Sequence, residues 1–302
     1  MITGLESNPG NPALCLSVSQ PSEVMPGTTT CGPFGENGVY YPATGGVING
    51  TRAPFGPLFA SNAWYDTMGN SSYNAFEAAG RFTSGRAQFL ASYTLSKAMD
   101  NASGLGDQVY PFDYKLTKAL SAFDLTDNFV FSYSYTLPFD RVLGQNRLGS
   151  GWKLSGITRF ATGFPVTLTE SDDNSLLGTS SSGVGNEVDE PNYTPGNLHL
   201  TDPRTGLPYF DTSLFSPEAL GQFGTANRRF FHGPGLNNFD MALVKDLHLT
   251  ESKSLEFRAE WFNTFNHVQF MSPVGNIDSE TFGLVTAANN PRIGQLALKF
   301  FF

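Results

Sequence analysis

The segment DNFVFSYSYTL, residues 127–137, has side chains that alternate strictly between two kinds of face. One face carries large apolar or aromatic side chains: Phe129, Phe131, Tyr133, Tyr135 and Leu137. The other carries small or polar ones: Asn128, Val130, Ser132, Ser134 and Thr136. Because successive side chains of a β-strand point to opposite sides, this period of two predicts a strand with one apolar and one polar face.

The same alternation recurs along the chain. It is clear in residues 86–97, 254–262 and 293–302, and weaker in 73–82, 152–164 and 237–247. With the first segment this predicts seven strands, and an eighth candidate lies at 57–66. Phe, Tyr and Trp make up 14% of the 302 residues, against 15% for all charged residues, a balance that favours β structure.

Composition excludes several other classes of protein. The sequence has no run of about 20 apolar residues, so a membrane-spanning helix is not expected. The chain is too apolar and aromatic to be disordered. Its net charge of −9 argues against nucleic acid as a partner, because phosphate binding requires a basic surface.

Short and long connections alternate between the predicted strands. The links at 83–85, 138–151 and 248–253 are short, whereas those at 98–126, 170–236 and 265–292 are long, as is the lead-in 1–72. Bacterial outer-membrane barrels have short periplasmic turns and long extracellular loops. The strands also average about ten residues, close to the 9–11 that a tilted strand needs to cross the bilayer. We therefore expect an all-β, antiparallel transmembrane barrel segment, with strands in 73–302 preceded by a loop and partial-strand region in 1–72.

The two faces of the strands fit such a barrel. In a wide barrel the polar face lines a wet lumen and the apolar face contacts lipid. We expect Glu256, Arg258 and Glu260, which alternate with apolar residues along 254–262, to face the lumen. An ordinary sandwich of two stacked sheets with an aromatic core remains an alternative from periodicity alone.

The chain ends in LALKFFF, with large apolar residues at every second position: Leu296, Leu298, Phe300 and Phe302. Most soluble chains end in frayed polar residues, whereas this ending is suited to strand pairing up to its last residue. It resembles the C-terminal signal that bacterial outer-membrane proteins present to the barrel-assembly machinery.

Several longer stretches resemble one family. They are SYNAF (72–76), ASYTLSK (91–97), FSYSYTLPF (131–139), GWKLSGIT (151–158), TGFP (162–165), GPGLNNFD (233–240) and FRAEWFNTFNH (257–267). Together they cover roughly residues 55–302 in order, and they are similar to the C-terminal part of an Oar-like TonB-dependent receptor.

The resemblance implies a Gram-negative outer-membrane transporter with a barrel of about 22 strands, an upstream plug and contact with the TonB energy-transducing protein. Seven or eight strands cannot close such a barrel, so we expect this chain to be its C-terminal fragment, without the signal peptide. The implied partners are outer-membrane lipid and lipopolysaccharide, the barrel-assembly machinery, and an unknown nutrient or polypeptide substrate. No cofactor is implied.

Candidate sites are few. The long loop 170–236 is the best candidate for substrate contact. Its acidic residues Asp172, Asp173 and Asp189, with Glu187 and Glu190, are weak candidates for Ca²⁺, and a solvated acidic loop is the simpler interpretation. Cys15 and Cys31 lie in a Pro/Gly/Thr-rich stretch and are expected to form a disulfide, with two free thiols as the alternative.

Residues that follow the 254–262 strand have an expected structural role. Asn263, Asn266 and His267 lie where a strand gives way to a loop, and their side chains are expected to satisfy backbone groups at the rim.

Two further functions stay open. A small, self-closing eight-strand barrel could serve as an adhesin or structural surface protein, and an upstream signal peptide rather than a plug would favour it. A soluble β-sandwich enzyme with two catalytic carboxylates is disfavoured, because Glu256 and Glu260 on one strand lie about 13 Å apart. No nucleophile elbow, P-loop or zinc pattern occurs in the sequence, so we do not expect an enzyme.

Overall fold

The computed structural model describes residues 63–104, 107, 117–144, 146–171, 190–218 and 223–302, with side chains from Thr67 onward. It also gives the backbone of three short strands, β1 (Thr3–Glu6), β2 (Tyr40–Tyr41) and β3 (Gly46–Val47). Several predicted site residues lie outside the described residues: Cys15, Cys31, Asp172, Asp173, Glu187 and Asp189.

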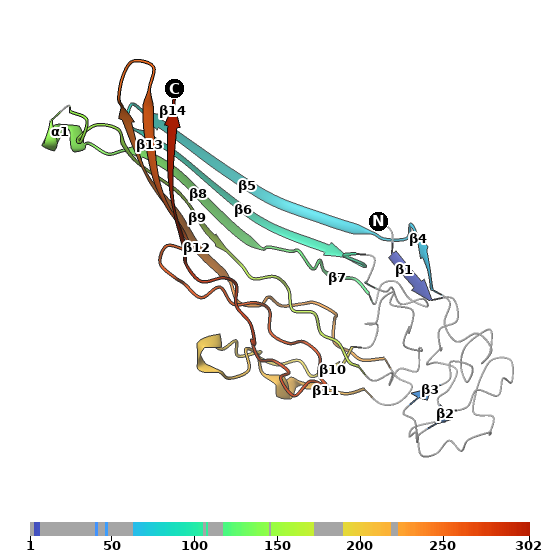
Figure 1. Ribbon diagram of the computed structural model, residues 1–302. Helices are drawn as coiled ribbons and strands as arrows, with labels where there is room; N and C mark the ends of the chain where they lie inside the picture. The colour runs from blue at the N-terminus through green and yellow to red at the C-terminus, as the bar shows by residue number, and fades with distance from the viewer. Residues whose placement is uncertain are drawn as a thin grey trace.

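One large antiparallel sheet dominates the structure (Figure 1). Its strands are β5 (Ser71–Ser84), β6 (Ala87–Asp100), β8 (Asp127–Thr136), β9 (Trp152–Ala161), β12 (Leu236–His248), β13 (Ser254–Phe262) and β14 (Ile293–Phe301). Each pairs with the next in chain order, and the two-residue strand β7 (Ala119–Leu120) adds to β6. All seven predicted strands are confirmed.

The eighth candidate strand has a different place. Within 57–66 the structure has β4 (Ala63–Asp66), which pairs with β1 in a separate two-stranded sheet. The expectation of an eighth strand in the main sheet is therefore not met by β4. Its four residues are too short to cross a bilayer, which needs about 9–11.

The strand register keeps the two faces separate across the whole sheet. Phe129 lies opposite Tyr93 on β6 and Phe160 on β9, whereas Ser132 lies opposite Leu90 and Ile157. Side chains in register share a face, so the aromatic residues of neighbouring strands form continuous rows. We call these the aromatic face, which contains Phe129, and the polar face, which contains Ser132.

Ring contacts run across the aromatic face from strand to strand. Phe82 stacks on Phe89 with ring centroids 6.0 Å apart, and Phe89 stacks on Phe131 at 5.8 Å. Farther along the sheet, Phe160 meets Phe239 edge to face at 5.5 Å. Such aromatic pairs add to the cohesion of the sheet beyond simple area burial.

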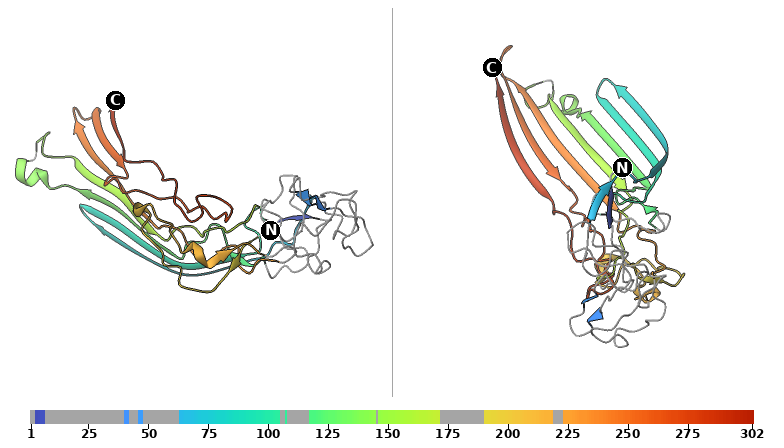
Figure 2. Two further views of the ribbon diagram at one scale, coloured as in Figure 1. Left: turned by 90° about the horizontal axis from the view of Figure 1, so that it is seen from below. Right: turned by 90° about the vertical axis from the view of Figure 1, so that its right-hand side faces the viewer.

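The connections separate into two ends (Figures 1 and 2). The short-turn end carries residues 85–86, the segment 137–151 with the five-residue helix α1 (Phe139–Leu143), and residues 249–253. The long-loop end carries the described residues of the segments 101–126, 162–235 and 263–292. Figure 2 shows that the sheet is strongly curved and that the long loops gather beyond one end of it.

Short elements stabilise the longest loop. They are β10 (Asn192–Tyr193) paired with β11 (Phe215–Ser216), and the 3-10 helices η5 (Pro203–Thr205) and η6 (Thr212–Leu214). Asp202 and Asp211 cap η5 and η6 by accepting hydrogen bonds from the backbone two residues ahead. Within the described residues, no helix has the length and apolar character that crossing a bilayer requires.

Candidate functional site

The polar face carries a charged ladder on β13 and β14. Arg258 Nη1 lies 3.3 Å from Glu260 Oε1, and Arg258 Nε lies 3.9 Å from Glu256 Oε1. From the neighbouring strand, Lys299 Nζ lies 3.9 Å from Glu256 Oε1, and the Gln295 amide donates to Glu260. The three residues predicted to face a lumen are thus together on the polar face, where Arg258 and Lys299 balance the charges of Glu256 and Glu260.

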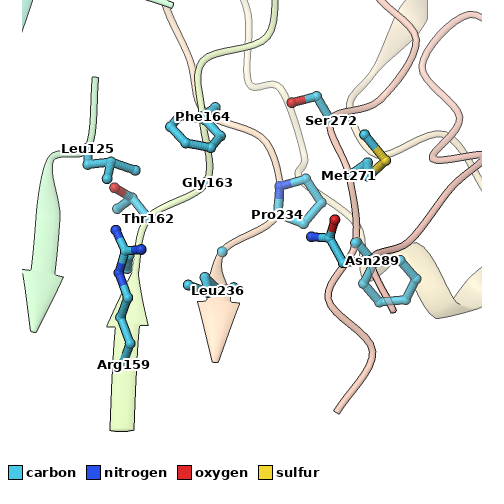
Figure 3. A pocket seen from close by; sticks show the side chains of 13 residues that line it. Leu125, Arg159, Thr162, Gly163, Phe164, Pro234, Leu236, Met271, Ser272 and Asn289 are labelled. Carbon is cyan, nitrogen blue, oxygen red and sulfur yellow. The ribbon is translucent and has the colours of Figure 1, made fainter. Parts of the chain in front are cut away.

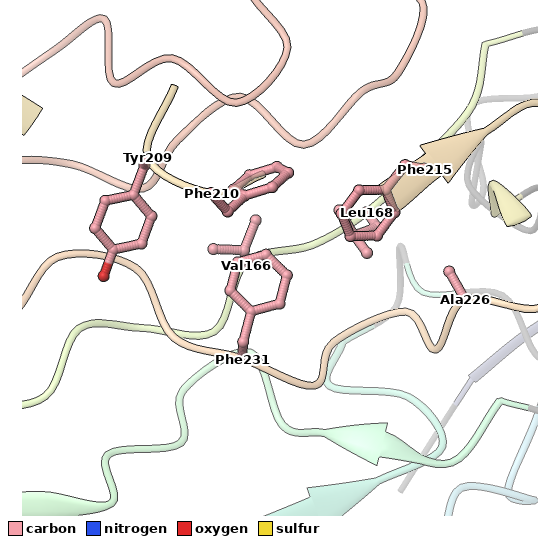
Figure 4. Close-up of a cluster of buried hydrophobic side chains, with 7 residues drawn as sticks. All are labelled: Val166, Leu168, Tyr209, Phe210, Phe215, Ala226 and Phe231. Atoms are coloured by element: carbon pink, nitrogen blue, oxygen red, sulfur yellow. The ribbon is translucent and has the colours of Figure 1, made fainter. Parts of the chain in front are cut away.

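The long loops have a hydrophobic core of their own, which we call the loop core (Figure 4). Its buried members are Val166, Leu168, Tyr209, Phe210, Phe215, Ala226 and Phe231. Phe210 is at its centre, with ring centroids 5.1 Å from Phe231, 5.3 Å from Phe282 and 5.5 Å from Phe215. Segments far apart in the sequence therefore pack around one hydrophobic core at the long-loop end.

Backbone pairing links the loop core to the sheet. The segment that follows β9 and the segment that precedes β12 continue side by side past the ends of these strands. Val166 N donates to Phe231 O at 3.0 Å and Leu168 N to Arg228 O at 3.0 Å. Gly275 makes a close approach to this extension, because a Cβ there would lie 1.7 Å from Thr167 O. Only glycine fits at that position.

A buried ionic cluster joins this extension to the end of β6. Arg228 contacts Asp100 at 3.1 Å and Asp107 at 3.0 Å, and Arg229 contacts Asp107 at 3.2 Å. Arg229 Nε also donates to Thr167 Oγ1 at 2.7 Å. The cluster thus ties Asp100 and Asp107, at the end of β6 and just beyond it, to Arg228 and Arg229 of the extension.

The carboxyl of Asp107 is strongly influenced by these arginines. Burial by itself would raise its pKa, but the hydrogen bond from Arg229 and the charges of Arg228 and Arg229 outweigh this and hold the pKa below its usual range. The carboxyl also accepts a 2.6 Å hydrogen bond from the Ser103 backbone. Asp107 is therefore ionised throughout the neutral range.

A second buried polar contact, between Asp124 and His232, lies beside the ionic cluster. Asp124 is buried, accepts a 2.5 Å hydrogen bond from Ala98 N, and lies 2.8 Å from His232 Nε2. His232 itself forms an antiparallel bridge with Pro165. No local pattern indicates this pairing, because the two residues are 108 positions apart. The adjacent arginines of Asn227-Arg228-Arg229-Phe230, set among aromatic residues, were the only local hint of the ionic cluster.

Two asparagine side chains hold the backbone of the rim, the segment that follows β13. Asn263 donates to His267 O at 2.8 Å and accepts from His267 N at 2.9 Å, and Asn266 accepts from Arg292 N at 2.9 Å. Both asparagines have positive φ, 50° and 54°, a conformation that asparagine tolerates better than most residues. The prediction that these side chains satisfy backbone groups is confirmed for Asn263 and Asn266. It is wrong for His267, whose ring packs against Phe239 and Phe265 and whose buried Nδ1 has no hydrogen-bond partner among the described residues.

A pocket of about 310 Å³ lies where β9 and β12 give way to the loops (Figure 3). Arg159 and Ala161 contribute from the polar face of β9. Its apolar walls come from four chain segments: Leu125, Phe164, Pro234, Leu236, Phe270 and Met271. Thr162, Ser272 and Asn289 add polar groups.

The short-turn end has features of a membrane–water boundary. On the aromatic face, the Lys245 amine lies 5.3 Å from the centroid of the Trp152 ring and donates to backbone carbonyls of the 147–150 turn. The Trp152 indole donates to Leu148 O at 2.8 Å. An amphipathic ring and a lysine that extends to polar groups are typical of the edge of a bilayer.

Metal binding gains no support from the described part of the chain. It contains no group of three His, Cys, Asp or Glu side chains placed to hold an ion. Of the acidic residues proposed for Ca²⁺, only Glu190 is described, and it is buried. The others lie outside the described residues, so their prediction stays untested.

The antiparallel sheet, its two distinct faces and its alternating connections agree with a comparison against known families. The profile of the outer membrane beta barrel domain matches residues 8–295. The chain belongs to this family. The outer-membrane β-barrel protein accordingly resides in the outer membrane, as predicted. Comparisons with curated proteins and with solved structures gave no match.

Proposed function

We propose that this outer-membrane β-barrel protein forms part of the wall of a TonB-dependent transporter. The polar face would line the pore, and the loops of the long-loop end would contact the substrate. One observation carries the proposal: the two edge strands of the sheet, β5 and β14, run in the same direction.

The direction of the edge strands bears on how the barrel closes. In a sheet of seven strands, each antiparallel to the next, the direction alternates along the sheet. The first and seventh strands, β5 and β14, therefore run in the same direction. Bacterial single-chain barrels have an even number of strands, all antiparallel. Direct pairing of β5 with β14 would create a parallel pair, so closure needs at least one further strand. This requires a barrel of at least eight strands, and the family resemblance of the sequence favours a larger one.

The chemistry of the two faces supports their orientation. Glu256, Arg258, Glu260 and Lys299 share the polar face, and charged side chains on the lipid side of a barrel cost about 2–4 kcal/mol near the bilayer centre for Arg and Lys. The aromatic face, with its rows of Phe and Tyr, suits acyl chains. In the proposed arrangement it contacts outer-membrane lipid and lipopolysaccharide, while β14 presents the assembly signal.

The proposed transport is passive for this part of the molecule. Its wall and loops bind the substrate, a nutrient or polypeptide, and energy comes through the TonB system acting on parts outside the described sheet. We assign it no catalytic role.

The functional test is uptake in the native bacterium. Cells that lack the gene are expected to lose uptake of the substrate, and cells that have the gene but lack an energised inner membrane are expected to lose it equally. If deletion alters only surface attachment and leaves uptake of all tested nutrients unchanged, the protein is a surface adhesin or structural protein instead.

The architectural test uses cysteine pairs. Ala79→Cys on β5 and Ala297→Cys on β14 both lie on the polar face of the edge strands. In an eight-strand barrel one strand separates them, about 10 Å, and a bismaleimide of that span would join them. We expect no such cross-link, whereas Glu260→Cys with Gln295→Cys, directly opposite on neighbouring strands, serves as the positive control.

A further inference from the structure

The pocket beside Arg159 has the size and position of a ligand site. Its volume of about 310 Å³ is at the lower end of the range for small-molecule sites, roughly 300–1,000 Å³. It lies at the junction of the polar face and the folded loops, with Arg159 on one side and Met271 on the opposite side (Figure 3).

Arg159 is the one charged residue among the residues that line the pocket. Its Nε donates to Asn128 Oδ1 at 2.9 Å, which fixes the plane of the guanidinium. No salt bridge to Arg159 occurs within the described part of the chain. The two Nη groups are therefore not neutralised by a carboxylate of the protein.

The carboxylates nearest in register are engaged elsewhere. Asp240 is two residues along β12 from Asn238, the partner of Arg159, and it accepts a 2.8 Å hydrogen bond from Asn263 N. Asp127 accepts a 2.5 Å hydrogen bond from the Tyr93 hydroxyl. An uncompensated guanidinium beside apolar walls, in a chain with net charge −9, is a selective place for one anionic group.

We infer that this pocket binds a small organic carboxylate with an apolar body. Arg159 holds the carboxylate in the bidentate geometry that guanidinium groups favour, with Asn128 as the positioning residue. The rings of Phe164 and Phe270 and the thioether of Met271 cover the apolar body. Binding of the carboxylate does not depend on the proposed function. The further statement that such carboxylates are substrates for uptake rests on it.

Two sources share this chemistry: a free fatty or aromatic acid, and the C-terminal carboxylate of a peptide. The probes are octanoate and N-acetylphenylalanine, each compared with its neutral amide. Binding is measured by calorimetry on the protein purified from outer membranes in a non-ionic detergent. We expect each acid to bind at least tenfold more tightly than its amide. The acid with the higher affinity shows whether the ligand is a free acid or the C-terminus of a peptide.

Variants assign the site. Arg159→Gln is expected to weaken acid binding at least tenfold, and Arg159→Lys less, because lysine keeps the charge but loses the planar fork. Arg81→Gln, an arginine on the same face of edge strand β5, is the matched control and is expected to bind like the unaltered protein. Met271→Trp keeps the charge but fills the pocket, and it is expected to weaken both probes.

Equal affinity for acid and amide, or unchanged binding by Arg159→Gln, would overturn the inference. If Arg159→Gln does not fold, the comparison of acid with amide and the Met271→Trp variant still decide. Calorimetry measures binding independently of transport, so the two proposals can fail separately. If the protein binds the carboxylate but cells show no energy-dependent uptake, only the transporter proposal is overturned. Energy-dependent uptake without carboxylate binding would remove this inference alone.

Discussion

Arg228 Nη2 lies 3.1 Å from Asp100 Oδ1, although 128 residues separate them in the sequence. Their side chains are 3% and 0% exposed. Asp100 ends β6, and Arg228 belongs to the extension that supports the loop core. This pair therefore connects the membrane sheet to the folded loops, and it does so where water cannot replace a lost partner.

Replacing Arg228 with Met is expected to release the loops from the sheet. Removing one partner of a buried ion pair costs about 3–5 kcal/mol, because the remaining charge is left unpaired. Hydrogen exchange should increase in 101–126 and 162–235, while strands β5 to β14 stay protected. The control is Arg204→Met, which breaks an exposed pair with Asp202 and should cost less than about 1 kcal/mol. Equal effects of the two variants would contradict a structural role for the buried pair.

Acid is expected to loosen the same loops through Asp107. Its pKa is lowered in the folded protein, so its contribution to stability is complete above the unfolded value of about 3.9 and is lost as pH falls through the lower folded pKa. Proteolysis of the loops should be constant from about pH 8 to pH 5 and accelerate below about pH 4. Asp107→Asn should remove this acid step. Acceleration already near pH 6 would assign the loosening to a different group.

The orientation of the sheet can be tested at adjacent positions of β8. Phe131 is on the aromatic face and Ser132 on the polar face, both near the middle of the strand. Phe131→Arg should lower the free energy of unfolding in lipid vesicles by about 2–4 kcal/mol or more, because arginine would face lipid. Ser132→Arg should change it by less than about 1 kcal/mol, since its side chain would stay in water. Urea titration with tryptophan fluorescence measures both, and the reverse order would exchange the lipid and lumen assignments.

The last residue is predicted to matter for assembly more than for stability. The rings of Phe300 and Phe302 stack with centroids 5.9 Å apart at the end of β14, and Phe302 is 93% exposed. Phe302→Ala should slow insertion by the assembly machinery in cells, whereas refolding of purified protein should be unchanged, because little packing is lost. Phe301→Ala, a neighbouring exposed residue of the same type, is the control. Identical insertion rates for the two variants would remove Phe302 from the signal.

The sequence by itself determined the strands, their two faces and the alternation of short and long connections. These properties are local: the period of two along 127–137 or 254–262 specifies a strand and its faces wherever that strand lies. The rim asparagines were likewise predictable, because Asn263 and His267 interact over four residues. Resemblance to a transporter family came from the same segments.

Only the tertiary structure decided the ionic cluster, the loop core and the pocket at Arg159. Arg228 meets Asp100 across 128 residues, and Phe210 meets Phe282 across 72, with no periodicity in the loops to indicate either contact. The pocket needs four segments at once. Such contacts depend on how the sheet brings the loops together at one end, a relationship that the order of residues along the chain does not contain.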